Sequence, residues 1–165
     1  MLEDAFMQNA LTYAARHELR FAERLGFGVH GIIHVAEQKL RGGKTALKAH
    51  HETDPYPRKR ETYERLRRAG VTEILGFNVP QFIRADDELS VIEMTIVARP
   101  FVLDFAGTCL DRRPDFSEEA WAVWESEKRE QFDVRWLVVL RVLAALEEFG
   151  IYMLDVSPGN VAFAD

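Results

Sequence analysis

The chain has 165 residues, 47% of them hydrophobic, which suffices for one domain with an ordinary buried core. Its formal net charge of −6 at pH 7 argues against nucleic acid or an anionic membrane as the main partner. The single cysteine, Cys109, excludes an intrachain disulfide, and the first residues lack the basic and apolar regions of a signal peptide. The longest apolar stretch, 136–146, is too short to span a bilayer. We therefore expect a cytoplasmic protein that binds neither nucleic acid nor membrane.

Residues 1–24 predict an N-terminal helical segment, because apolar side chains recur there at roughly helical spacing between charged residues. Glycine then becomes frequent from residue 26. The strand-like runs at 32–36 and 45–49, separated by a Gly-Gly turn, predict a hairpin followed by a third strand.

A charged amphipathic helix is expected at 59–69, with Gly70 ending it. The runs at 79–83 and 89–97 predict an antiparallel strand pair joined by an acidic turn. Residues 25–97 therefore predict a five-stranded antiparallel sheet with one packed helix, and the chain as a whole an α+β fold.

Residues 98–165 begin with an irregular connector, after which Ser117 and two glutamates mark the start of a helix. The apolar pattern continues for some thirty residues, too long for one ordinary helix. We expect two helices, with a break at 131–133 and the second helix deeply buried.

The run L-D-V-S-P-G-N carries the first chemical pattern, with Asp155 and Asn160 five residues apart around a Ser-Pro-Gly turn. The spacing is that of a catalytic loop in which an aspartate orients an attacking hydroxyl and an asparagine holds a metal ion. The structural alternative is a turn-capping aspartate beside a tight turn.

The stretch G-F-G-V-H-G-I-I contains Gly26, Gly28 and Gly31 and fits G-x-G-x-x-G-x-V with isoleucine at the last position. A strand-like run follows it, as over the phosphates of a protein kinase, whereas a dinucleotide fingerprint would open a helix. Lys48 lies in T-A-L-K, 20 residues after Gly28, and would bind phosphates. The alternatives are a plain glycine-rich hairpin and a solvated lysine.

Together, in this order, the three motifs resemble those of the protein-kinase family, and the resemblance extends from about residue 20 to the C-terminus. It implies an ATP-binding protein, with a sheet-bearing N-lobe at 25–97 and a hinge-like connector and minimal helical C-lobe with a catalytic-loop hairpin at 98–165. Asp155 and Lys48 would be catalytic, Asn160 would bind Mg²⁺, and the backbone of Glu93 and Thr95 would contact adenine. The ion-pair partner of Lys48 would be Glu61 or Glu64, of which Glu61 is preferred.

Departures from the family pattern leave two functions open. Met153 and Leu154 replace the His-Arg of H-R-D, and Lys59 occupies the position where the helix glutamate belongs. Five residues follow Asn160, none of them in a D-F-G motif, so Asp165 is the only candidate for the second metal ligand.

The first function is phosphoryl transfer from ATP to a hydroxyl acceptor, either serine or threonine or a small molecule. The second is an inactive pseudokinase that binds nucleotide or holds a partner. In either case we expect a second copy or another protein to cover apolar helix surface around Trp121, Trp124 and Trp136.

Overall fold

The computed structural model describes residues 2–28, 31–50, 56–97, 102–105 and 107–164. The chain forms two compact units, each assembled from two separate stretches of sequence. Unit 1 comprises Met1–Arg60 and Pro80–Ile96, and unit 2 comprises Glu61–Val79 and Val97–Asp165. Helix α2 (Tyr56–Arg68) contributes residues to both.

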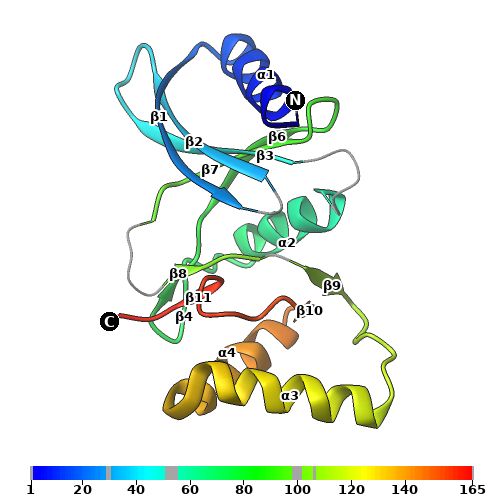
Figure 1. Ribbon diagram of the computed structural model, residues 1–165. Coiled ribbons are helices and arrows are strands. Elements are labelled where there is room, and N and C mark those ends of the chain that lie inside the picture. Colours follow the sequence, from blue (N-terminus) through cyan, green and yellow to red (C-terminus); the bar gives the residue numbers. More distant parts are fainter. Residues whose placement is uncertain (1, 29–30, 51–55, 98–101, 106, 165) are drawn as a thin grey trace. The chain divides into compact units, whose positions relative to one another are not determined.

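Unit 1 is built on a five-stranded antiparallel sheet in the order β1-β2-β3-β7-β6 (Figure 1). Its strands are β1 (Leu19–Gly28), β2 (Gly31–Gln38), β3 (Lys44–Ala49), β6 (Phe82–Asp86) and β7 (Val91–Met94). The predicted α+β class and the five-stranded antiparallel sheet are thereby confirmed.

The N-terminal helix α1 (Leu2–Arg16) is shorter than predicted. Glu18, with φ 54°, turns the chain, and β1 begins at Leu19. The prediction of helix as far as residue 24 is therefore wrong. Leu19 is buried and Arg20 exposed, so a few residues of strand alternation were mistaken for a continuation of the helical pattern.

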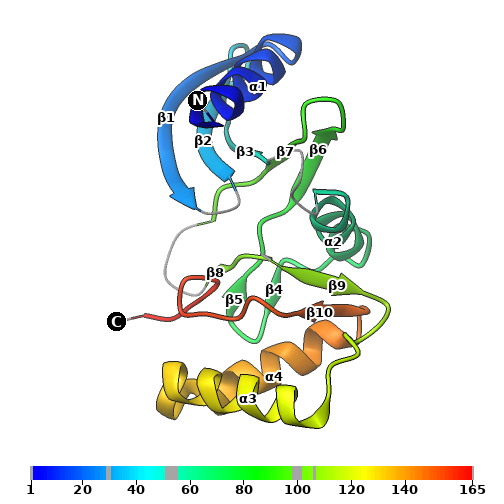
Figure 2. The same ribbon diagram turned by 45° about the vertical axis from the view of Figure 1, so that its right-hand side comes forward.

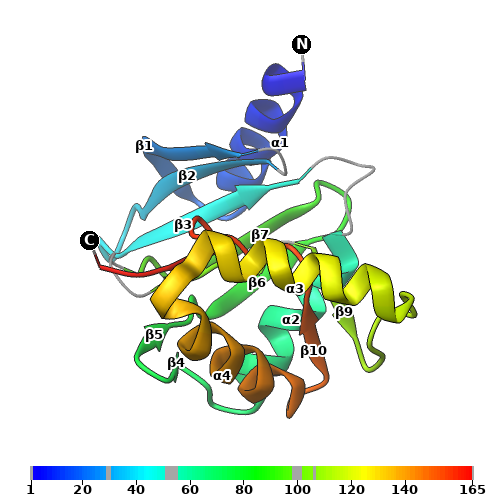
Figure 3. The same cartoon turned by 60° about the horizontal axis from the view of Figure 1, so that its bottom comes forward.

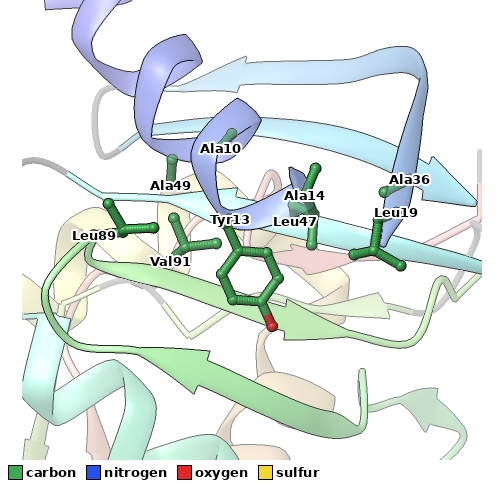
Figure 4. Close-up of a cluster of buried hydrophobic side chains, with 9 residues drawn as sticks. All are labelled: Ala10, Tyr13, Ala14, Leu19, Ala36, Leu47, Ala49, Leu89 and Val91. Carbon is green, nitrogen blue, oxygen red and sulfur yellow. The ribbon is translucent and has the colours of Figure 1, made fainter. Parts of the chain in front are cut away.

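Helix α1 packs on one face of the sheet through small and aromatic side chains (Figure 4). Ala10, Tyr13 and Ala14 lie against Leu47 and Val91, among other buried residues. Arg16 adds an ion pair with Asp86 of β6 at 2.8 Å. This face of the sheet is therefore occupied by the protein's own helix.

His17 directly follows α1, and its ring lies 4.4 Å from that of Tyr13. The environment of His17 leads us to expect that stability depends on pH. Burial, with the nearby Arg84 charge, lowers the pKa of His17 below 6.5, against smaller opposite effects of Glu93 and Asp86. The unfolded state therefore takes up the proton first as the pH falls. Stability from this group is present above about pH 6.5 and is lost as the pH falls to the folded-state pKa.

We therefore expect the melting temperature to decrease between pH 7.5 and pH 5, and His17→Gln to flatten that decrease. Melting curves of the two proteins across this range test the expectation. Equal pH slopes for wild type and variant would assign the dependence to other groups.

Unit 2 combines short strands with two main helices (Figure 2). A four-stranded sheet has the order β11-β8-β5-β4, and a separate pair joins β9 to β10. The strands are β4 (Glu73–Ile74), β5 (Phe77–Asn78), β8 (Val102–Leu103), β9 (Thr108–Leu110), β10 (Ile151–Met153) and β11 (Val161–Ala162). The predicted catalytic-loop hairpin is wrong, because β10 pairs with β9 and β11 pairs with β8.

Helices α3 (Glu118–Phe132) and α4 (Trp136–Glu147) lie against one another, separated by a short 3₁₀ turn, η1 (Asp133–Arg135) (Figure 3). Asp133, with φ 50°, ends α3, which confirms the predicted break. Ser117 caps α3 by accepting a hydrogen bond from the Ala120 amide at 3.1 Å.

Helix α4 is buried along one stripe only, so the prediction of a deeply buried helix is wrong. Trp136, around which we expected apolar surface in need of cover, is itself 3% exposed, whereas Leu137 is 70% and Val134 84% exposed. Leu137 directly follows the buried Trp136, and Val134 lies in η1 just before the helix. No helix among the described residues is long and apolar enough to cross a membrane.

Candidate functional site

The loop between β10 and β11 holds Asp155 and Asn160 in a set of short backbone hydrogen bonds. The Val156 amide donates to the Leu154 carbonyl at 2.9 Å, which closes a three-residue turn centred on Asp155. The Asn160 and Val161 amides both donate to the Ser157 carbonyl, at 2.9 and 2.8 Å. Val156 and Val161 are fully buried and anchor the loop at both ends.

Asn160 is tied directly to Asp155. Its Nδ2 donates to the main-chain carbonyl of Asp155 at 2.7 Å. Only the nitrogen of the carboxamide can donate to a carbonyl, so this bond also determines which branch of the side chain carries Oδ1. The bond is made to the Asp155 main chain and not to its carboxylate, and the Asp155 side chain is half-buried.

The strand that leads into the loop is held at its start by Arg65 of α2. The Arg65 guanidinium makes two bonds to the Asp111 carboxylate, at 2.6 and 3.0 Å, and a third to the Phe149 carbonyl at 3.0 Å. This pairing lowers the pKa of Asp111. Gly150, where α4 turns into β10, has φ +69°, a left-handed backbone conformation that favours glycine.

Lys48 lies on the face of the unit 1 sheet opposite to α1. Leu47 and Ala49 belong to the cluster under α1, and side chains alternate along a strand, so Lys48 projects from the other face. It is paired in register with Ile33 on β2 and Ile92 on β7, and it is 6% exposed. Lys48 is therefore a buried cation on a largely apolar sheet face.

The glycine-rich segment lies in the same cross-strand row as Lys48. Gly26 is paired with Ile33, which in turn is paired with Lys48. Two strand spacings correspond to about 10 Å. Gly28 and Gly31 face each other at the end of this hairpin, and residues 29 and 30 lie outside the described part.

Glu93 has a role that the sequence did not indicate. Its side chain is fully buried on the α1 face and accepts hydrogen bonds from Tyr13 (2.8 Å), Thr45 (2.9 Å) and Arg84 (2.6 Å). Burial and the bond to this carboxylate raise the pKa of Tyr13 well above its ordinary value. Glu93 thus joins the helix to the sheet.

The backbone of the predicted hinge is also engaged within unit 1. Glu93 is in register with Leu47 on one side and Arg84 on the other. The Thr95 amide donates to the Gln81 carbonyl at 2.9 Å, and Thr95 Oγ1 accepts from the Gln81 amide at 2.8 Å. An adenine contact through the Thr95 amide would have to replace the bond to Gln81.

The remaining residues of the predicted site are Glu61 and Asp165, together with Lys59 at the position of the family's glutamate. The Glu61 carboxylate pairs with arginines of its own helix, with Arg68 at 2.7 Å and Arg65 at 3.5 Å, and these pairs would compete with Lys48 for it. Lys59, at the position expected for the family's glutamate, is 1% exposed. Asp165 lies outside the described residues.

The predicted site residues therefore form two groups. Asp155 and Asn160 belong to unit 2, and the glycine-rich hairpin, Lys48, Glu93 and Thr95 belong to unit 1. Each group is defined within its own unit.

A magnesium ion finds only part of its usual donor set here. Mg²⁺ prefers six oxygen ligands and commonly takes one or two carboxylates together with substrate phosphates and water. Among the described residues, no group of three or more His, Cys, Asp or Glu could hold a metal ion. Asn160 Oδ1 is suited to be one ligand, but the described residues do not make a complete magnesium site.

Comparison of the chain with protein-family models gives no match, and comparison with curated proteins gives none either. The kinase-like resemblance consequently rests on the motifs and on the local geometry of each unit.

Proposed function

We propose that this chain is a kinase-like protein that binds ATP and transfers its γ-phosphoryl group to a hydroxyl acceptor. The observation that carries the proposal is the 2.7 Å bond from Asn160 Nδ2 to the Asp155 carbonyl. It gives the D-x-x-x-x-N pattern a braced conformation, because the bond holds the Asp155 main chain and uses the nitrogen of the Asn160 carboxamide rather than Oδ1.

In this function Asp155 accepts a hydrogen bond from the acceptor hydroxyl and orients it toward the γ-phosphorus. Lys48 binds the α and β phosphates, and the amides of Gly26, Gly28 and Gly31 approach the phosphates closely because these residues lack side chains. Magnesium, when bound, would neutralise phosphate charge, and Asn160 would hold it.

The buried position of Lys48 supports its part in the proposal. A solvated surface lysine keeps its ammonium in water, whereas Lys48 is 6% exposed. The row from Gly26 through Ile33 to Lys48 brings this cation to the glycine-rich hairpin, as a phosphate site would require.

The second candidate is a catalytically inactive pseudokinase-type module that binds nucleotide or a protein partner. The incomplete magnesium donor set of the described residues favours it, because phosphoryl transfer depends on metal neutralisation of the phosphates. Apolar side chains exposed on α4 are consistent with a protein partner or a second copy.

A melting curve tests the nucleotide-binding part of both candidates. ATP at about a hundred times its Kd should stabilise the folded protein by about 2.7 kcal/mol. For a chain of this size that corresponds to an increase in melting temperature of about 5–10 °C, and Mg²⁺ should add little. Lys48→Met should remove most of the increase without lowering the melting temperature of the ligand-free protein much.

Lys44→Met is the matched control, since Lys44 lies on the same strand and face as Lys48 with 54% of its side chain exposed. It should leave the ATP response intact. No response to ATP or ADP at millimolar concentration, with or without Mg²⁺, would rule out the nucleotide proposal. A response only with Mg²⁺ would indicate a complete metal site.

A further inference from the structure

Leu154, the residue immediately before Asp155, is held through its main chain from two sides within unit 2. The Leu154 amide donates to the Gly107 carbonyl at 3.0 Å. The Leu154 carbonyl accepts two hydrogen bonds, from Trp124 Nε1 at 3.3 Å and from the Val156 amide at 2.9 Å. The amide and the carbonyl of Leu154 are thus both hydrogen-bonded. These bonds restrain the direction in which the chain enters Asp155.

Gly107 also leaves no room for a side chain beside Asp155. A Cβ at position 107 would lie 3.0 Å from Asp155 Cβ and 3.4 Å from the Asp155 amide nitrogen. The backbone there has φ +56°, which disfavours other residues independently of the contact. A side chain at this position would therefore push on the Asp155 side chain at its root.

Trp124 is held rigidly enough to direct its N–H. Its ring packs edge-on against Trp121 at 5.6 Å and against Trp136 at 6.2 Å between ring centroids. Trp136 is almost completely buried on α4, so the indole of Trp124 is held from both sides. Helix α3 therefore contributes a fixed donor to the Asp155 turn.

We infer that Gly107 and Trp124 are positioning residues for Asp155, an inference that rests on the catalytic role proposed above for that carboxylate. Gly107 holds the Leu154 amide and leaves room for the Asp155 side chain, and Trp124 holds the Leu154 carbonyl. Neither touches the reacting groups. Their effect on transfer comes from the orientation of the carboxylate, and a displacement of about 1 Å costs on the order of a hundredfold in rate.

The test uses Trp124→Phe, which keeps an aromatic ring and removes the N–H donor. The matched control is Trp121→Phe, on the same helix and in the same aromatic row, because Trp121 makes no hydrogen bond to this loop within the described chain. Amide hydrogen exchange at Leu154 and Val156 should become about three- to tenfold faster in Trp124→Phe. It should stay at the wild-type rate in Trp121→Phe.

Steady-state kinetics supply the second readout. Trp124→Phe should lower kcat by about tenfold and leave the ATP affinity unchanged, because the displaced group acts on the acceptor and not on the nucleotide. Unchanged exchange at both amides, or equal acceleration in the two tryptophan variants, would overturn the inference. If the wild type transfers no phosphoryl group, the proposed function fails, and the exchange measurement still decides whether Trp124 holds the turn.

Gly107→Ala gives an independent check, with Gly70→Ala as its control. Gly70 has a similar φ of +69° but nothing within 4 Å of its would-be Cβ, so the two variants share backbone strain and differ in the collision with Asp155. Faster exchange at Leu154 and Val156 in Gly107→Ala alone supports positioning. Equal exchange rates in the two variants would show that position 107 requires glycine only because of its backbone angle, and would contradict a positioning role.

Discussion

Asp155→Asn should lower phosphoryl transfer by about a hundredfold to ten-thousandfold, the usual contribution of a positioned acid–base group. The substitution removes the carboxylate that would accept the hydrogen bond from the hydroxyl of the acceptor, and it keeps a side chain of the same shape. The loop bond from Asn160 goes to the Asp155 main chain, so the turn itself should persist. ATP affinity should change little, because the carboxylate acts mainly in the transition state.

The measurement is ADP release in the presence of serine, threonine and small-molecule hydroxyl acceptors, with ATP affinity determined separately from melting curves. Asp115→Asn, an exposed aspartate on the connector before α3, is the control and should transfer at the wild-type rate. Wild-type transfer by Asp155→Asn would remove this residue from the mechanism. Absence of transfer by the wild type to every acceptor, with ATP binding retained, would favour the inactive binding module.

Glu93→Ala should destabilise unit 1 by about 3–5 kcal/mol, the range for breaking a buried charge pair by removing one partner. The substitution leaves the buried hydroxyls of Tyr13 and Thr45 without this acceptor and Arg84 without its carboxylate. Glu93→Gln keeps the volume and an acceptor oxygen, so it should cost less, about 1–3 kcal/mol. Glu88→Ala removes an exposed carboxylate nearby and should stay within about 0.5 kcal/mol of wild type.

The positions of the three tryptophans allow the destabilisation caused by Glu93→Ala to be measured separately in unit 1 and unit 2. All of them lie in unit 2, so tryptophan fluorescence reports unfolding there, while amide exchange in β3 and β7 reports unit 1. We expect the exchange in β3 and β7 to respond strongly to Glu93→Ala. A loss of less than about 1 kcal/mol would show that the Tyr13–Glu93–Arg84 network contributes little to stability.

Several local features could be predicted because they depend on neighbours in the sequence. Apolar spacing located the helices at 56–68, 118–132 and 136–147 to within a few residues, and alternation located most of the unit 1 strands. In unit 2 the extended segments on either side of the Asp155–Asn160 loop were predicted with the wrong pairing, and β4, β5, β8 and β9 were missed because strands of two or three residues are too short to display a period. The end of α1 was misplaced for the related reason that Leu19 to Arg24 contain too little alternation to override a preceding helical pattern.

The sequence by itself determined the α+β class, the order of the main elements and the spacing of Asp155 and Asn160, since all three depend on local periodicity and turn residues. Only the tertiary structure decided that Glu93 is a buried link to α1, because its partner Tyr13 is 80 residues away. The contacts of Gly107 and Trp124 with the Asp155 turn were likewise out of reach of the sequence. Hydrogen bonds between distant segments depend on which faces the folded chain buries against each other, so no local pattern in the sequence encodes them. Burial also makes such bonds costly to lose.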